Sequence, residues 1–131
     1  MTATHPRWEE WLEARTLELV FPNNTNHLGN LFGGALIAWM DKVGGFAAMR
    51  RAHSTVATVS MDHIEFKTPI NEGDLVELVA SVEQVGCTSL TVRVEASRED
   101  LMSGSRELCS VGYFTFVALD DDGRPKPVPE S

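Results

Sequence analysis

The sequence predicts an α+β domain in which a curved, five-stranded antiparallel sheet wraps around one long central helix. Three observations carry this prediction. The stretch from Gly33 or Gly34 to about Arg51 has a helical pattern and is apolar nearly all round between Ala35 and Met40, as is typical of a helix buried at the centre of a domain. Patterns of alternating apolar and polar residues, typical of strands, occur once before this stretch and four times after it. Short connections join the later segments, which favours antiparallel neighbours.

The N-terminal segment, residues 1–14, predicts a short helical extension. Pro6 stands in the first turn, where a helix tolerates proline. Trp8 and Trp11 fall on one helical face, which we expect to pack on the domain or on a neighbouring subunit. Residues 16–21 then alternate as a strand, which Pro22-Asn23-Asn24 ends.

The long helix is followed by strands alone. Arg50 and Arg51 close the helix, because positive charge is favourable at the negative end of the helix dipole. Beyond His53 the apolar residues recur with a period of two, and breaks at proline, asparagine and glycine separate the segments. The predicted strands are 55–66, 75–85, 88–96 and 107–119, with a loop at 97–105 and an irregular C-terminal tail at 120–131.

Composition predicts a globular protein with a single domain, residues 1–131. With 43% hydrophobic and 23% charged residues, the chain is long enough for one core, and no run approaches the ~20 apolar residues of a membrane span. No secretory signal is visible, so we expect a cytoplasmic protein. The net charge of -8 argues against nucleic acid as a partner. Cys87 and Cys109 lack metal-ligand spacing, which predicts reduced thiols and no metal site.

A polar, glycine-rich turn, residues 26–34, leads directly into the hydrophobic helix, and one acid, Asp41, interrupts that helix. A buried acid is costly unless it is paired or hydrogen-bonded. At about 100° per residue, the residues that project within roughly 40° of Asp41 are small or aliphatic. They are Gly34, Ile37, Gly45 and Ala48. A ligand or another backbone can approach such a stripe closely, so the pattern predicts a binding or catalytic site.

An ordered set of residues runs from this turn to the last predicted strand. It comprises Asn26-(x6)-Gly33-Gly34-(x6)-Asp41, Val59-Ser60-Met61-Asp62 with Phe66 and Pro69, Gly73-Asp74, and Phe114-Thr115-Phe116-Val117-Ala118. In this order the set resembles hotdog-fold acyl-CoA thioesterases, most closely the YciA-like and cytosolic acyl-CoA hydrolase subgroup. The resemblance covers about residues 17–129. It implies the hotdog fold and hydrolysis of fatty acyl-CoA to free fatty acid and CoA.

The resemblance also implies roles for three residues. Asp41 takes the position of the acid that activates water or attacks the thioester directly. Asn26 takes that of the amide that orients the water or the substrate, and Gly33 that of the glycine whose backbone N–H receives the thioester oxygen. One departure is Cys87, where this subgroup often has an arginine that contacts phosphate. The resemblance implies medium-to-long acyl chains as substrates.

Thioester hydrolysis needs few protein groups. A helix N-terminus offers unpaired N–H groups to an oxyanion, and glycine there lets a carbonyl come close. The CoA thiolate is a good leaving group, so one carboxylate base suffices. We expect no cofactor, since CoA is part of the substrate. Further candidates for substrate contact are Gly34, Ser60, Arg93, Arg124 and Lys126, of which the basic residues are candidates for the CoA phosphates.

The spacing between Gly33 and Asp41 predicts a site shared by two chains. Eight residues correspond to about 12 Å along one helix, which is long for one carbonyl and its attacking water. Two helices packed antiparallel across a two-fold axis would bring Gly33 of one chain to Asp41 of the other. The resemblance implies the same shared site. We therefore expect a homodimer, assembled further into a hexamer (a trimer of dimers) or a tetramer.

Other interpretations remain open at the level of sequence. Asn26 is also a common turn residue, the two glycines before the helix also suit close packing, and Asn30 is a candidate helix cap. A hydratase or dehydratase on the same fold would need a histidine paired with an acid, and His27 is its only candidate near the helix start. A non-catalytic acyl-CoA-binding sensor would not need Asp41, and a purely structural module leaves that acid unexplained.

Overall fold

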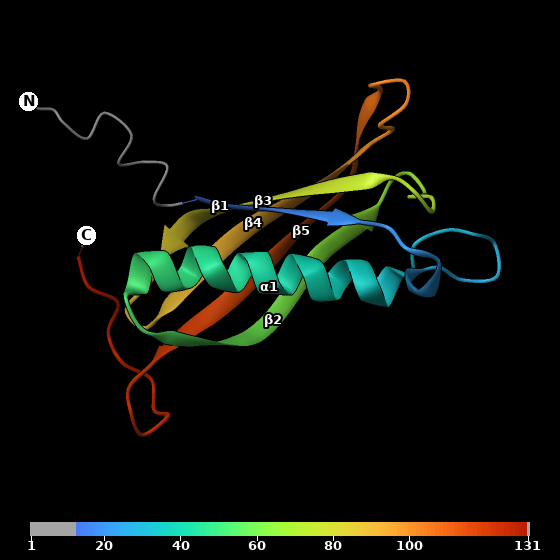
Figure 1. Cartoon of the computed structure of the whole chain (residues 1–131). Helices are drawn as coiled ribbons and strands as arrows, with labels where there is room; N and C mark the ends of the chain where they lie inside the picture. The colour runs from blue at the N-terminus through green and yellow to red at the C-terminus, as the bar shows by residue number, and fades with distance from the viewer. Residues whose placement is uncertain (1–12, 131) are drawn as a thin grey trace, which may run out of the picture.

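The computed structural model describes residues 13–130 and shows one antiparallel sheet curved around one helix (Figure 1). The five strands are hydrogen-bonded in the order β1-β3-β4-β5-β2, and each neighbouring pair is antiparallel. The elements are β1 (Glu13–Leu19), a short 3-10 helix η2 (Pro22–Asn24), α1 (Gly33–Ala52), β2 (Thr55–Phe66), β3 (Leu75–Val85), β4 (Ser89–Glu99) and β5 (Arg106–Leu119). The predicted α+β hotdog fold is confirmed.

The helix α1 lies across the concave face of the sheet and contacts all five strands (Figure 1). Its residues Leu36, Met40 and Val43 are buried in a core that includes Phe114 and Phe116 of β5. One face of the helix is thus buried within this chain, whereas Phe46 (40%) and Met49 (36%) of the same helix are exposed, so the expected burial on all sides is not met within one chain. The helix also holds its first turn at one end of the sheet and its last turn at the other (Figure 1).

The strand β1 starts earlier than the predicted 16–21 and ends at Leu19. The reason is pairing with β3, which runs from Glu13 opposite Ser81 to Leu19 opposite Leu75. The pattern of neighbouring residues along the chain cannot predict such pairing with a distant strand. The last two residues assigned to the extension 1–14 thus belong to β1, whereas Trp8 and Trp11 lie outside the described residues.

The loop predicted at 97–105 is shorter in the structure, because β4 continues to Glu99 and β5 begins at Arg106. Arg98 forms ion pairs with Glu107 on the neighbouring strand (3.2 Å) and with Asp74 (3.4 Å). Paired charges across two strands support a polar extension of a hairpin, and the sequence pattern assigned these polar residues to a loop. The tail at 120–130 contains neither helix nor strand, as predicted.

The described part of the chain contains neither a membrane-spanning helix nor a cluster of metal-ligating side chains. No helix within residues 13–130 is long and apolar enough to cross a membrane. Within the same residues, no group of three or more His, Cys, Asp or Glu side chains is arranged to hold a metal ion.

The strand β2 forms one edge of the sheet, and two irregularities interrupt its pairing with β5. The register shifts between Thr58 and Ser60 and again between Asp62 and Glu65. Within the second shift, His63 has φ 53°, a left-handed conformation that is costly for a residue with a Cβ. On this strand Val59 is 56% and Met61 43% exposed. A long apolar edge strand is a surface that proteins normally cover.

Gly112 of β5 lies opposite the second irregularity, and we expect Gly112→Ala to destabilise the fold. A Cβ there would lie 2.9 Å from Cγ1 of Ile64 and 3.3 Å from the ring of Phe114, both packed in the core. Overpacking of this kind lowers the free energy of unfolding by ~1–3 kcal/mol, which urea unfolding measures. Gly34→Ala is the control, because its Cβ meets nothing within 4 Å. Equal stability of the two variants would contradict the packing argument.

Candidate active site

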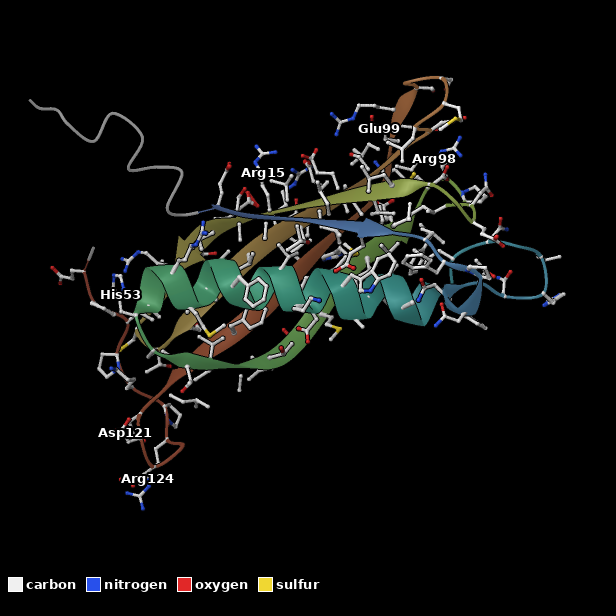
Figure 2. The ribbon with its side chains drawn as sticks, viewed as in Figure 1. Arg15, His53, Arg98, Glu99, Asp121 and Arg124 are labelled. Atoms are coloured by element: carbon white, nitrogen blue, oxygen red, sulfur yellow. The ribbon has the colours of Figure 1, made fainter. Side chains whose placement is uncertain are left out.

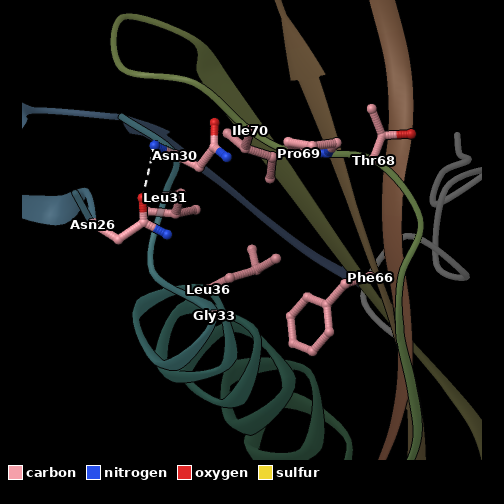
Figure 3. A pocket seen from close by; sticks show the side chains of 9 residues that line it. All are labelled: Asn26, Asn30, Leu31, Gly33, Leu36, Phe66, Thr68, Pro69 and Ile70. Atoms are coloured by element: carbon pink, nitrogen blue, oxygen red, sulfur yellow. Dashed lines mark hydrogen bonds between the residues drawn. The ribbon is translucent and has the colours of Figure 1, made fainter. Parts of the chain in front are cut away.

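Asn26 closes the turn that precedes α1. Its Oδ1 accepts hydrogen bonds from the backbone N–H groups of Leu28 (2.9 Å) and Asn30 (3.2 Å), and its backbone N–H donates to the carbonyl of Asn30 (2.8 Å). Figure 3 shows the side chain at the edge of a hollow beside the helix start. Because the amide oxygen is occupied within the turn, the NH2 group is the part left to donate to a ligand. Asn26 therefore serves the turn and also offers a donor.

Backbone hydrogen bonds fix this turn to its surroundings. The N–H of Leu31 donates to the carbonyl of Ile70 (2.7 Å), and the N–H of Glu72 donates to the carbonyl of Gly29 (3.2 Å). The N–H of Phe32 donates to the carbonyl of Asn24 (2.9 Å). The turn is thus held against the connection between β2 and β3, and the amide of Asn26 has a fixed position relative to the first turn of α1.

The N-terminus of α1 is uncapped. Its N-cap residue is Phe32, and no side chain caps the helix. The interpretation of Asn30 as a cap was wrong, since Asn30 forms a β-bridge with Asn71. Among residues 13–130, the N–H groups of Gly33, Gly34 and Ala35 donate to no acceptor. These groups lie at the positive end of the helix dipole, where an oxyanion is stabilised.

The two glycines at the helix start do not serve close packing. A Cβ on Gly34 would meet nothing within 4 Å, and a Cβ on Gly33 would lie 3.7 Å from the ring of Phe66, an ordinary contact distance. The space that these glycines leave open is therefore available to a ligand.

A hollow of about 270 Å³ opens at the helix start (Figure 3). Asn26 and Gly33 both line it, so the structure brings these two predicted site residues together. The remaining lining residues are Asn30, Leu31, Leu36, Phe66, Thr68, Pro69 and Ile70.

Asp41 lies elsewhere on the same helix and does not line this hollow. It is half-buried rather than fully buried, and its Oδ1 accepts a hydrogen bond of 2.7 Å from the hydroxyl of Thr58 on β2. This bond fixes the carboxylate against the exposed edge of the sheet. Within one chain, the helix separates Asp41 from Gly33 by about 12 Å along its axis, so these two predicted site residues lie apart within one chain.

Thr58 is the residue of this arrangement that the sequence analysis missed. Ser60 was the predicted hydroxyl, and it lies on the same strand, opposite Thr115. The irregularity between Thr58 and Ser60 breaks the simple alternation of β2. No local signal in the sequence says which residue of a strand faces an acid on a distant helix.

The basic candidates lie away from the hollow within one chain. Arg93 is on β4 between the buried Val92 and Val94, and it forms an ion pair with Glu95. Arg124 lies in the C-terminal tail, beyond the opposite end of α1 from the hollow (Figure 2). Lys126 follows in the same tail, where its backbone N–H donates to the carbonyl of Ala118 (2.9 Å).

Two further residues of the sequence analysis are placed by the structure. Cys87 is an exposed free thiol in the turn between β3 and β4. His27 is exposed in the turn closed by Asn26, and it forms an ion pair with no acid in the described part of the chain. The histidine–acid pair that a hydratase would need is therefore missing at this position.

The sheet order and the central helix define the fold, and comparison with known sequences gives the class of protein. A sequence model of the thioesterase superfamily matches residues 28–105, and the chain belongs to this family, alongside acyl-CoA thioester hydrolases of the YciA and YkhA type.

Two relatives illustrate the similarity. The uncharacterized acyl-CoA thioester hydrolase YkhA of Bacillus subtilis is 43% identical over 110 residues, which are 84% of this chain and 64% of that protein. The chain thus spans just under two thirds of the length of YkhA. The acyl-CoA thioester hydrolase YciA of Escherichia coli is 34% identical over 132 residues, which are 98% of each chain.

Among solved structures, one similar protein is an acyl-CoA hydrolase from Staphylococcus aureus, which was solved in complex with butyryl-CoA, CoA and CoA disulfide. The two structures superpose with a TM-score of 0.87 at 38% identity, over 92% of this chain and 74% of that one. Structures of that enzyme are also known with alanine in place of an asparagine, an aspartate and a threonine. The intervals between those three positions equal the intervals from Asn26 to Asp41 and from Asp41 to Thr58.

Proposed function

We propose that this chain is an acyl-CoA thioester hydrolase that converts a fatty acyl-CoA and water to a free fatty acid and CoA. The observation that carries the proposal is the uncapped start of α1 beside the fixed amide of Asn26. Backbone N–H groups without an acceptor at the start of a helix, with a side-chain NH2 beside them, suit a carbonyl that gains negative charge during attack. The carboxylate of Asp41, oriented by Thr58, supplies the base.

The reaction follows from these groups. The thioester carbonyl oxygen accepts hydrogen bonds from the N–H of Gly33 and its neighbours. Asp41 takes a proton from a water molecule as the water oxygen attacks the carbonyl carbon, and the NH2 group of Asn26 donates to that water or to the carbonyl oxygen. The tetrahedral intermediate collapses, the carbon–sulfur bond breaks, and CoA leaves as the thiolate. The proton held by Asp41 passes to the thiolate, and no cofactor takes part.

The site is shared between two chains in this proposal. Asn26 and Gly33 come from one chain, and Asp41 with Thr58 comes from its two-fold partner. The exposed apolar edge of β2 supports such a partner, because it carries unpaired backbone groups beside Val59 and Met61 and lies next to Asp41 through Thr58. A similar acyl-CoA thioesterase of known structure, with a TM-score of 0.89 and 40% identity over 92% of this chain, is hexameric. We propose that the dimers of this chain also assemble further, into a hexamer.

If two helices pack antiparallel, the C-terminal tail of one chain lies at the same end of the dimer as the helix start of its partner. Arg124 and Lys126 belong to the C-terminal tail, and Arg51 at the end of α1 donates to the carbonyl of Pro129 in the same tail (2.6 Å). Because an antiparallel partner would bring its helix start to this end of α1, Arg124 and Lys126 are the candidates for the CoA phosphates. Arg93 is engaged with Glu95 and receives no role. The free thiols Cys87 and Cys109 accord with a reducing compartment, and we propose the cytoplasm.

Release of free thiol from a panel of acyl-CoAs, from acetyl to palmitoyl, tests the proposed function. Turnover of at least one member supports it. Tight binding of acyl-CoA without thiol release would point to a non-catalytic sensor, and hydration of an enoyl-CoA without thiol release would point to a hydratase. The absence of binding and turnover across the panel would refute the whole proposal.

Replacement of Asn26 should lower kcat more than it raises KM. In Asn26→Ala the donor to the water or to the developing charge is lost, and such an interaction counts mainly in the transition state. We expect a loss of ~10²–10³ in kcat, the range for removal of one oxyanion donor. Steady-state kinetics with one acyl-CoA measure both constants. A rise in KM with kcat unchanged would make Asn26 a binding residue instead.

Thr58→Val should lower kcat by roughly 10- to 100-fold with little change in KM. A hydrogen bond to a charged group contributes ~1.5–3 kcal/mol, and about 1.4 kcal/mol corresponds to tenfold in rate. Valine preserves the shape of threonine, so the loss reports the hydroxyl alone. Thr58→Ser retains the donor and should stay within a few-fold of the parent enzyme. Similar kcat values for the valine and serine variants would exclude the hydroxyl from the mechanism.

A further inference from the structure

The hollow at the start of α1 has an apolar floor. Leu31, Leu36 and Ile70 are all buried and line it from three different segments, and Phe66 stands across from them (Figure 3). The polar groups around it are largely engaged elsewhere. The oxygen of Asn26 accepts two backbone N–H groups, and the hydroxyl of Thr68 donates to Glu107 (3.0 Å). Apart from the side-chain amides of Asn26 and Asn30 and the N–H of Gly33, the hollow therefore presents mainly apolar atoms.

Phe66 owes its place to the second irregularity of β2. The left-handed backbone of His63 and the register shift between Asp62 and Glu65 redirect the end of the strand. Two hydrogen bonds then hold the redirected backbone. The buried hydroxyl of Ser110 donates to the carbonyl of Glu65 (2.6 Å), and the N–H of Lys67 donates to the carbonyl of Cys109 (2.8 Å).

The ring of Phe66 forms the wall of the hollow that faces the reacting group. It comes within 3.7 Å of the position that a Cβ on Gly33 would occupy, yet 54% of the residue is exposed. The strand holds the backbone of Phe66 in place, and because the ring is half-exposed, its substitution leaves no cavity in the core. It stands directly beside the N–H that, in the proposed function, receives the thioester oxygen.

We propose that this hollow receives the acyl chain of the substrate and that Phe66 limits the length of chain that fits. The inference rests on the proposed function, which places the thioester carbonyl at Gly33. The acyl chain is the apolar arm of that thioester, whereas the pantetheine arm carries amides that would lose their hydrogen bonds over Leu31, Leu36 and Ile70. The floor of the hollow thus fits the acyl arm.

The hollow within one chain measures about 270 Å³, at the lower edge of the roughly 300–1,000 Å³ of sites that enclose drug-sized ligands. It is open, and in the proposed function a partner chain completes the site, so this volume does not set the length of the acyl chain. In this proposal the ring of Phe66 sets it.

The test is the ratio of kcat/KM for dodecanoyl-CoA to that for butyryl-CoA in the full-length oligomeric protein. Phe66→Ala should raise this ratio by about tenfold or more, since one methylene in an apolar pocket already changes discrimination by roughly 10-fold or more. Phe66→Trp should lower it. Phe21→Ala is the matched control, because Phe21 is 55% exposed and does not line the hollow. Its ratio should equal that of the parent chain.

Each outcome bears on one proposal. If the parent chain releases no thiol from any acyl-CoA, the proposed function fails. If the parent is active and both Phe66 variants keep its ratio, the acyl-chain assignment fails while the function stands. If Phe66→Ala does not fold, the half-exposed Phe66→Trp decides by the same ratio. Light scattering covers one more case: a change in oligomer size with an unchanged ratio would mean that a second copy of the chain fills the hollow.

Discussion

Asp41→Asn is expected to lower kcat by ~10²–10⁴ and to leave the fold and acyl-CoA binding in place. Loss of a general base costs this much in rate. The amide of asparagine is close in shape to the carboxylate and its oxygen still accepts the hydrogen bond from Thr58, so the packing around the site is preserved. Thiol release measures the rate, and inhibition by a non-hydrolysable acyl-CoA thioether measures binding.

The control for this substitution is Asp100→Asn. Asp100 is an exposed acid in the turn between β4 and β5, its Oδ1 accepts hydrogen bonds from backbone N–H groups that an asparagine oxygen can also accept, and it carries the same change of charge. Its kinetics should match those of the parent chain. Turnover by Asp41→Asn within a few-fold of the parent would remove this carboxylate from the mechanism, whatever its hydrogen bond.

The sequence predicted the helix and the spacing of its site residues well, because both depend on local periodicity. The apolar pattern from Gly33 onward and the eight-residue interval to Asp41 follow from one helix alone. The interval then predicted that Gly33 and Asp41 do not meet within one chain, and Asp41 indeed lies outside the hollow that Gly33 lines.

Features that depend on pairing between distant segments were not predicted. Thr58 faces Asp41 because β2 passes the helix at that point, just before the first irregularity in its pairing with β5. The polar residues at 97–99 belong to β4 because Arg98 finds Glu107 and Asp74 across the sheet. In both cases the deciding contact joins residues far apart along the chain, so no window of neighbouring residues contains the information.

The sharpest expected result concerns the sharing of the site between two chains. Chains with Asp41→Asn and chains with Asn26→Ala, each nearly inactive alone, are mixed, unfolded and refolded together. Each heterodimer then holds one site with both lesions and one site built from the intact Asn26 of one chain and the intact Asp41 of the other. With random pairing, half of the dimers are mixed and about a quarter of all sites should recover, a proportion fixed by two-fold symmetry.

The same mixture without unfolding is the control, because chains that do not exchange partners keep every site damaged. Subunit exchange is verified by giving one variant an affinity tag and recovering the other with it. If each site lay within a single chain, every chain would carry a lesion in its own site and no mixture would regain activity. Inactivity after verified exchange would therefore refute the shared site. Recovery near a quarter would place the helix start of one chain against Asp41 and Thr58 of its partner. This arrangement agrees with the separation of about 12 Å between Gly33 and Asp41 along one helix.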